Sequence, residues 1–166
     1  MLCSTRPAGQ TVVITDGAVY NEDVTIDKNL TLTSNGSSVP TLRQDGSSPL
    51  TFNSPSEQAN VSRIRLYMDS LAFGAPMIAN FAAATVRLTD IQSDLNAPGL
   101  NWFFDVGSGD WIVESVNMTM NGSGYLIGGG SGSVVINNSR LIGEDVGFDF
   151  TASSPSVTLE NTFINT

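Results

Sequence analysis

A repeat of short alternating segments in the second half of the chain constrains the fold more than any other feature. Four segments align without gaps, and each reads apolar, variable, apolar, variable, small polar: 86–90, 111–115, 134–138 and 157–161. Their centres are separated by 25, 23 and 23 residues. Alternation with period 2 is typical of a strand with one buried face. A near-constant spacing of such strands predicts a solenoid, because each coil then stacks on the previous one.

The aligned segments predict columns of equivalent side chains. The centres are expected to form an interior core column: Leu88, Val113, Ile136 and Leu159. The polar ends are expected to form a ladder at a bend, where they can hydrogen-bond backbone groups and one another: Asp90, Ser115, Asn138 and Asn161. Five residues past each centre lies a further position, apolar in three of four cases, which predicts a second short strand after the bend: Ser93, Met118, Leu141 and Ile164.

The upstream part has the same texture in a looser register. Period-2 fragments occur at 12–14, 24–26, 30–32 and 50–52, and residues 64–68 lie about one repeat before Leu88. Turn clusters rich in Gly, Ser and Asn separate them, and no helical period of useful length is present. An antiparallel sandwich also has short strands, but it does not usually repeat one side-chain order. We therefore predict an all-β chain with residues 1–166 as one domain of about seven coils.

Two stretches of the chain resemble a known family. Residues 12–32, with Asp16-Gly17 and Tyr20 in the turn and alternation around Lys28, are similar to the first coil of the pectin-lyase-like superfamily. Residues 134–140 and 157–163 resemble the parallel β-helix repeat of the same superfamily. The resemblance implies a single-stranded right-handed parallel β-helix. It implies little about activity, because the superfamily includes lyases, hydrolases, phage tailspikes, adhesins and inert surface proteins.

The catalytic residues that the resemblance would imply are largely missing. The chain has no His, so the galacturonan hydrolase pattern cannot be met, and Lys28 is its single Lys. A weak catalytic alternative is a carboxylate group served by Arg87 or Arg140: Asp105, Asp110 and Glu114. The loop from Asp105 to Asp110 also offers oxygens to Ca²⁺. Solvated turn carboxylates are the favoured interpretation, and we predict no metal and no cofactor.

Charge and apolar content exclude several partners. The formal net charge is −9, which disfavours nucleic acid because an acidic chain repels phosphate. No apolar run reaches the length of a transmembrane helix, so no membrane insertion is expected. The single cysteine, Cys3, excludes an intrachain disulfide.

Five Asn-x-Ser/Thr triplets point to the compartment. They are glycosylation candidates in an extracellular or cell-surface protein, with bare turn residues as the alternative: Asn35, Asn60, Asn117, Asn121 and Asn137. The first residues do not form a signal peptide. A mature chain or a fragment of a longer protein would fit that observation.

Apolar side chains and the end of the repeat predict self-association. The aromatic residues at 102–104 and Trp111 suit packing better than sugar binding, and residues 71–84 form a further apolar stretch. The chain ends within strand pattern with no capping helix, so a filament, a trimer or a place in a larger assembly is expected. We expect a non-catalytic extracellular structural or surface-adhesive protein, with carbohydrate as a further partner. The alternative is a polysaccharide lyase or glycoside hydrolase on the same fold.

Overall fold

The chain folds entirely into strands and the turns that join them. A computed structural model describes residues 7–44, 47–53, 58–69, 76–81, 85–96, 101–122, 124–143, 146–149 and 155–165. Within these residues there are twenty strands and no helix. Cys3 and most of the 71–84 stretch lie outside the described residues.

The strands form three parallel sheets, here named A, B and C. Sheet A contains β1 (Gln10–Ile14), β4 (Leu30–Ser34), β7 (Gln58–Ser62), β10 (Thr85–Thr89), β13 (Asp110–Glu114), β16 (Ser133–Asn137) and β19 (Ser156–Glu160). Sheet B contains β2 (Val19–Asn21), β5 (Thr41–Arg43), β8 (Arg65–Met68), β11 (Gln92–Leu95), β14 (Asn117–Met120), β17 (Arg140–Gly143) and β20 (Phe163–Asn165). Sheet C contains β3 (Val24–Ile26), β6 (Leu50–Phe52), β9 (Pro76–Asn80), β12 (Asn101–Asp105), β15 (Gly124–Gly128) and β18 (Val146–Asp149).

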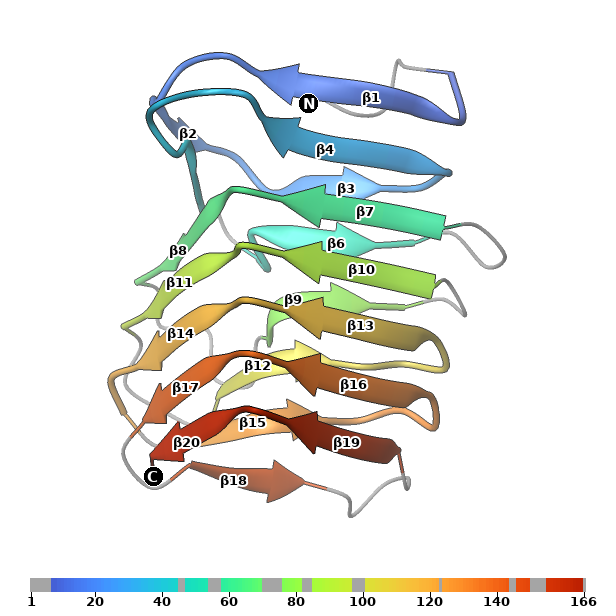
Figure 1. Cartoon of the computed structure of the whole chain (residues 1–166), viewed down its shortest axis with the longest axis vertical. Helices are drawn as coiled ribbons and strands as arrows, with labels where there is room; N and C mark the ends of the chain where they lie inside the picture. Colours follow the sequence, from blue (N-terminus) through green and yellow to red (C-terminus); the bar gives the residue numbers. More distant parts are fainter. Residues whose placement is uncertain are drawn as a thin grey trace.

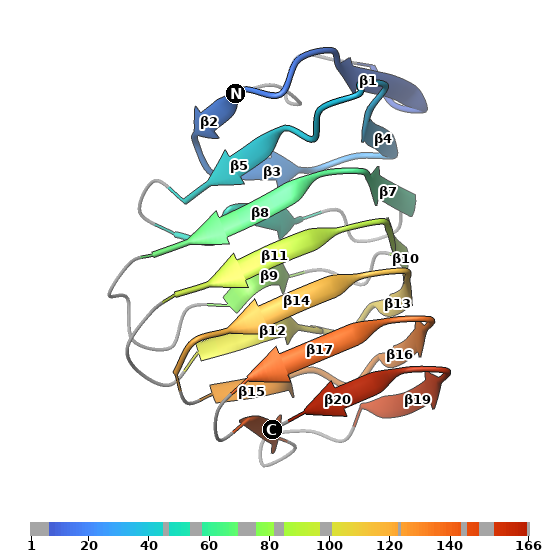
Figure 2. The same ribbon diagram turned by 60° about the vertical axis from the view of Figure 1, so that its left-hand side comes forward.

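Successive strands follow the order A, B, C, so each coil adds one strand to each sheet. Figure 1 shows the coils stacked along the long axis, from β1 near the N-terminus to β18, β19 and β20 near the C-terminus. Figure 2 turns sheet B forward, with β5, β8, β11, β14, β17 and β20 stacked in order. The prediction of an all-β solenoid of stacked parallel strands is confirmed.

The coils differ in length along the chain. In sheet A the paired residues Val12, Leu32, Val61 and Leu88 are separated by 20, 29 and 27 residues, whereas the later partners follow at 25, 23 and 23. The partner of Leu88 in the preceding coil is therefore Val61. Residues 64–68 instead run into sheet B, where Leu66 pairs with Ser93. Sheet A and sheet B strands share the same alternation, so the sequence spacing alone misaligned this segment.

The interior of the solenoid is apolar almost throughout. Inward residues of sheet A such as Leu32, Leu88 and Ile136 are fully buried, and the intervening residues face outward. Strand β9 also belongs to the core, because Met77 and Ile78 are fully buried. The 71–84 stretch is therefore not the exposed apolar surface that we expected, as far as it is described.

One residue in the left-handed conformation makes the corner between sheets A and B in the last five coils. These residues have φ between 47° and 58°: Arg63, Asp90, Ser115, Asn138 and Asn161. The backbone N–H of Asp90 donates to the carbonyl of Glu114 in the next coil, and that of Ser115 donates to Asn137 in the same way. Asn and Asp tolerate this conformation better than most residues. The corner therefore explains why a small polar residue recurs there.

Candidate functional site

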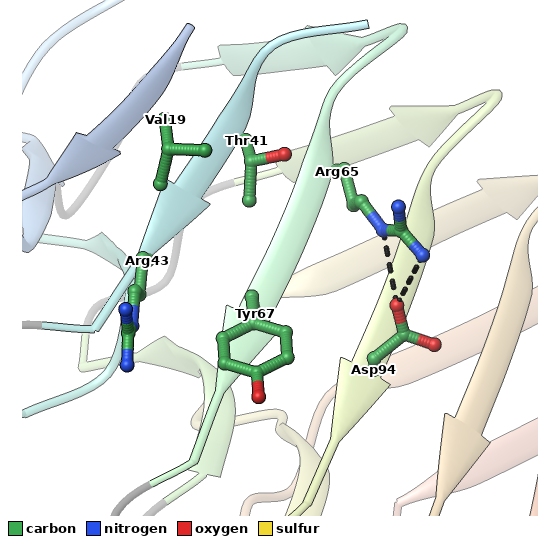
Figure 3. Close-up of a pocket in the computed structure, with 6 residues that line it drawn as sticks. All are labelled: Val19, Thr41, Arg43, Arg65, Tyr67 and Asp94. Atoms are coloured by element: carbon green, nitrogen blue, oxygen red, sulfur yellow. Dashed lines mark hydrogen bonds and ion pairs between the residues drawn. The ribbon is translucent and has the colours of Figure 1, made fainter.

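The candidate site is a shallow groove on the outer face of sheet B. Its volume is about 330 Å³, near the small end of the range for ligand sites. Side chains from the four strands β2, β5, β8 and β11 form it: Val19, Thr41, Arg43, Arg65, Tyr67 and Asp94. Figure 3 shows these side chains spread over the outer side of neighbouring strands. The groove is thus built by four successive coils.

Strand register explains the hollow. One outward row runs Val19, Thr41, Arg65, and the neighbouring row runs Arg43, Tyr67, Asp94. Val19 and Thr41 have short side chains, whereas the residues beside them are long or aromatic. The short pair therefore forms a floor between taller walls. Leu42 and Leu66 on the same strands point inward and are fully buried, which fixes the outward direction of the site residues.

Two ion pairs hold the walls. The Nε and Nη2 atoms of Arg65 both donate to Oδ2 of Asp94, at 3.0 and 2.6 Å (Figure 3). The Nη2 atom of Arg43 donates to Oδ2 of Asp69. Each pair joins adjacent coils of sheet B or the turn beyond it. Both are partly exposed, so each contributes at most about 1 kcal/mol to stability. Their main effect is to fix the guanidinium and carboxylate groups beside the groove.

Tyr67 lies between the two charged walls. The Cζ atom of Arg43 is 5.5 Å from the centroid of the Tyr67 ring, within the range of a cation–π contact. Figure 3 shows the ring nearly face-on between the Arg43 and Asp94 side chains. The aromatic face is therefore presented at the groove rather than packed into the core.

The three predicted catalytic carboxylates are not gathered into one site. Asp105 ends β12 in sheet C, whereas Asp110 and Glu114 lie at opposite ends of β13 in sheet A. The Cα atoms of two residues four positions apart on a strand are about 13 Å apart. Paired carboxylates of glycosidases need roughly 5–10 Å. Asp110 also accepts hydrogen bonds from the Ser133 hydroxyl and backbone N–H, at 2.6 and 3.3 Å, so it stabilises the neighbouring coil.

Asp105 has the most perturbed carboxyl environment of these three. Burial raises the pKa of Asp105 above its ordinary value, and a hydrogen bond from the backbone of Gly107 opposes that shift. Its Oδ1 atom lies 2.5 Å from the position that a Cβ atom would take at Gly129, where φ is +69°. Only glycine fits this corner, because a side chain would meet the carboxylate and would need a strained backbone.

The two predicted arginine partners lie on other faces. Arg87 is the central residue of β10 in sheet A, between Asn60 and Ile112 in the neighbouring strands. Arg140 begins β17 in sheet B, between Asn117 and Phe163. Neither adjoins Asp105, which lies on sheet C. No group of three or more His, Cys, Asp or Glu side chains suited to a metal ion occurs in the part of the chain that the structure describes.

The predicted core column and polar ladder occupy registered positions. Leu88, Val113, Ile136 and Leu159 are consecutive partners in sheet A. The first three are fully buried, but Leu159 in the last described coil is 41% exposed.

The four ladder residues, Asp90, Ser115, Asn138 and Asn161, are exposed at the left-handed corner. Among the described residues, no side-chain hydrogen bond joins one of them to another, because this conformation directs their side chains to solvent. The corner is instead held by backbone hydrogen bonds.

Three of the four predicted aromatic residues belong to the core. Phe103, Phe104 and Trp111 are fully buried. The Trp111 ring packs edge-on against Phe104 at 5.4 Å between centroids, and its Nε1 donates to the Val106 carbonyl. Trp102 is partly buried and stacks on Tyr125 in the next coil at 6.2 Å. Packing thus accounts for this group, and the sticky surface expected at residues 102–104 is not there.

The five predicted glycosylation candidates fall into two structural settings. Asn35 and Asn121 are exposed in turns that immediately follow a strand. The other three lie within strands, where a glycan would stand on an outer sheet face: Asn60 and Asn137 in sheet A and Asn117 in sheet B.

The chain was compared with known proteins in three ways. No protein-family model, no curated protein and no solved structure matches it. The described residues include no helix capable of crossing a membrane. What the protein binds is therefore inferred from the chemistry of its surface.

Sequence reasoning missed the groove residues apart from their strands. The available signal is the pair of strands Thr41-Leu42-Arg43 and Arg65-Leu66-Tyr67, in which large polar residues flank a buried leucine. That signal marks outward-facing residues, but it does not show that the two strands are neighbours. Their pairing depends on coil lengths that are irregular in this part of the chain.

Proposed function

We propose that the chain is a non-catalytic, surface-adhesive β-solenoid of the pectin-lyase-like kind that acts outside the cell and binds its ligand on the outer face of sheet B. The groove across β2, β5, β8 and β11 is the observation that carries the proposal. It combines an aromatic ring, two fixed ion pairs and a hydroxyl on a rigid sheet. Side chains held on strands over a packed core are well placed for recognition, because little conformational freedom is lost on binding.

The shape of the groove suits adhesion better than catalysis. It is open and crossed by ion pairs in which each carboxylate already faces a guanidinium. General acid and base groups need carboxylates whose pKa values are driven apart at a short separation. The carboxylates suggested for an enzyme lie on different sheets or at opposite strand ends, which weighs against the lyase or hydrolase alternative.

Amide shift mapping by NMR tests the proposal. The protein is titrated with a panel of neutral oligosaccharides, uronate oligosaccharides and short peptides. We expect at least one class to perturb amides of β2, β5, β8 and β11. Perturbation confined to another face, or none by any class, would contradict the proposal. So would turnover of the same polymers that Asp110→Asn abolishes, because that result favours the enzyme.

Self-association is a second candidate property, favoured by the exposure of apolar side chains in the last described coil. Leu159 and Phe163 are 41% and 56% exposed. We propose that a second copy covers these side chains. Light scattering across a concentration series tests this. We expect the mass to rise above that of a monomer and Phe163→Ser to lower it, whereas a monomer at every concentration opposes the idea.

A further inference from the structure

We propose that the groove on sheet B selects a neutral saccharide rather than an anionic one. This inference rests on the proposed function and adds the class of ligand. It follows from how the charges of the groove are paired, from the hydrogen-bonding groups that remain and from the aromatic face between them.

The charges around the groove balance. Arg43 is paired with Asp69, and Arg65 is paired with Asp94, so two guanidinium groups meet two carboxylates. An anionic ligand would have to displace a carboxylate that is already in place, on a chain whose net charge is −9. A cationic ligand would meet the guanidinium groups instead. A neutral ligand avoids both costs, since it leaves the ion pairs intact.

The remaining donors and acceptors match hydroxyl groups. A guanidinium has five N–H donors, and the bonds to Asp94 engage two of those on Arg65. Both bonds end on Oδ2 of Asp94, which leaves Oδ1 for a ligand donor. The Arg65 and Asp94 side chains are 48% and 35% exposed. A donor and an acceptor fixed side by side suit adjacent hydroxyls, because each hydroxyl both donates and accepts.

Tyr67 supplies the surface for the ring of the sugar. Its aromatic face carries negative charge density, which attracts positively polarised groups such as the C–H groups of a pyranose. Thr41 and Val19 form the floor beside it, with one hydroxyl and one apolar surface. The volume of about 330 Å³ fits a short saccharide segment lying across the strands rather than a deep enclosed ligand.

Calorimetry with two uncharged or charged hexasaccharides tests the inference. Cellohexaose is the neutral probe and hexagalacturonate the anionic one, each measured at low salt and at about 0.3 M salt. We expect cellohexaose to bind with little dependence on salt. Tyr67→Ala is expected to weaken that binding about tenfold, and Tyr67→Phe to retain most of it. Arg65→Lys should also weaken binding, because it keeps the charge but loses the forked geometry.

Controls separate the groove from the rest of the sheet and from the fold. Ile142→Ala alters the same outward row of sheet B, beyond the groove, and should leave binding unchanged. Circular dichroism of each variant shows whether it is folded. Binding of hexagalacturonate alone, weakened by salt, would overturn the neutral-ligand inference and leave the proposed function standing. Binding of neither, with a peptide mapped to the groove, would do the same, whereas an unperturbed groove would overturn both.

Discussion

The first two coils and the last five make the corner between sheets A and B in different ways. In the first two, four and six residues separate the strands, at 15–18 and 35–40. In the last five, two residues suffice, and the first of them is left-handed. Both kinds of coil nevertheless stack in register. The difference teaches that the shared core, rather than a constant coil length, aligns the strands of this solenoid.

The groove lies across the boundary between these two regions. Val19 and Thr41 come from the coils with wide corners, whereas Arg65, Tyr67 and Asp94 come from coils with the two-residue corner. The regular corner supports repetition, and the irregular part of the chain supplies the unlike side chains that a binding site needs.

The largest expected effect comes from a charge in the core of either region. Ile136→Asp in the regular part and Leu32→Asp in the irregular part should each cost roughly 4 kcal/mol or more, because both side chains are fully buried among apolar residues. Urea unfolding followed by circular dichroism measures this. Val135→Asp, which faces outward on the same strand as Ile136, is the control and should cost about 1 kcal/mol or less. A native unfolding midpoint for Leu32→Asp would show that the first coils do not share the core.

A smaller effect should distinguish the two kinds of corner. Asn138→Val places a β-branched side chain at φ 50° and should cost about 1–2 kcal/mol, whereas Asn138→Gly should cost little. Ser37→Val in the wide corner of the second coil should change stability by about 0.5 kcal/mol at most, because Ser37 is exposed and has no positive φ. Thermal unfolding of the three variants tests the contrast. Equal losses for Asn138→Val and Ser37→Val would remove the distinction.

The smallest effect concerns two serines inside the solenoid. The Ser93 hydroxyl is buried and has no hydrogen-bond partner, so Ser93→Ala should raise the free energy of unfolding by about 1 kcal/mol. The Ser139 hydroxyl accepts from Val116 N–H and donates to the Asn137 carbonyl. Ser139→Ala should therefore lower stability by about 1–2 kcal/mol. Chemical denaturation of both variants measures the difference, and a change of the same sign in both would contradict this account.

Much of the fold can be predicted from the sequence because local signals agree in the regular part. The alternation around Val113 and Ile136 requires one buried face, and the polar residues Ser115 and Asn138 suit a left-handed corner. The irregular part could not be aligned this way. Leu66 resembles a sheet A residue in its local pattern, but the position equivalent to Leu88 is Val61, in a coil of different length. A period-2 pattern identifies a strand without identifying the sheet to which it belongs.

The sequence by itself determined that this chain forms short strands with one apolar face, and that later coils repeat at a nearly constant length. Only the tertiary structure decided which outward side chains meet. Thr41 and Arg65 become neighbours because 24 residues separate them in the stacked coils, and Arg65 and Gln92 because 27 do. Local propensity does not encode such distances, since turns of several lengths can return the chain to the same sheet. The core under the sheet selects one register, and the groove is a consequence of that selection.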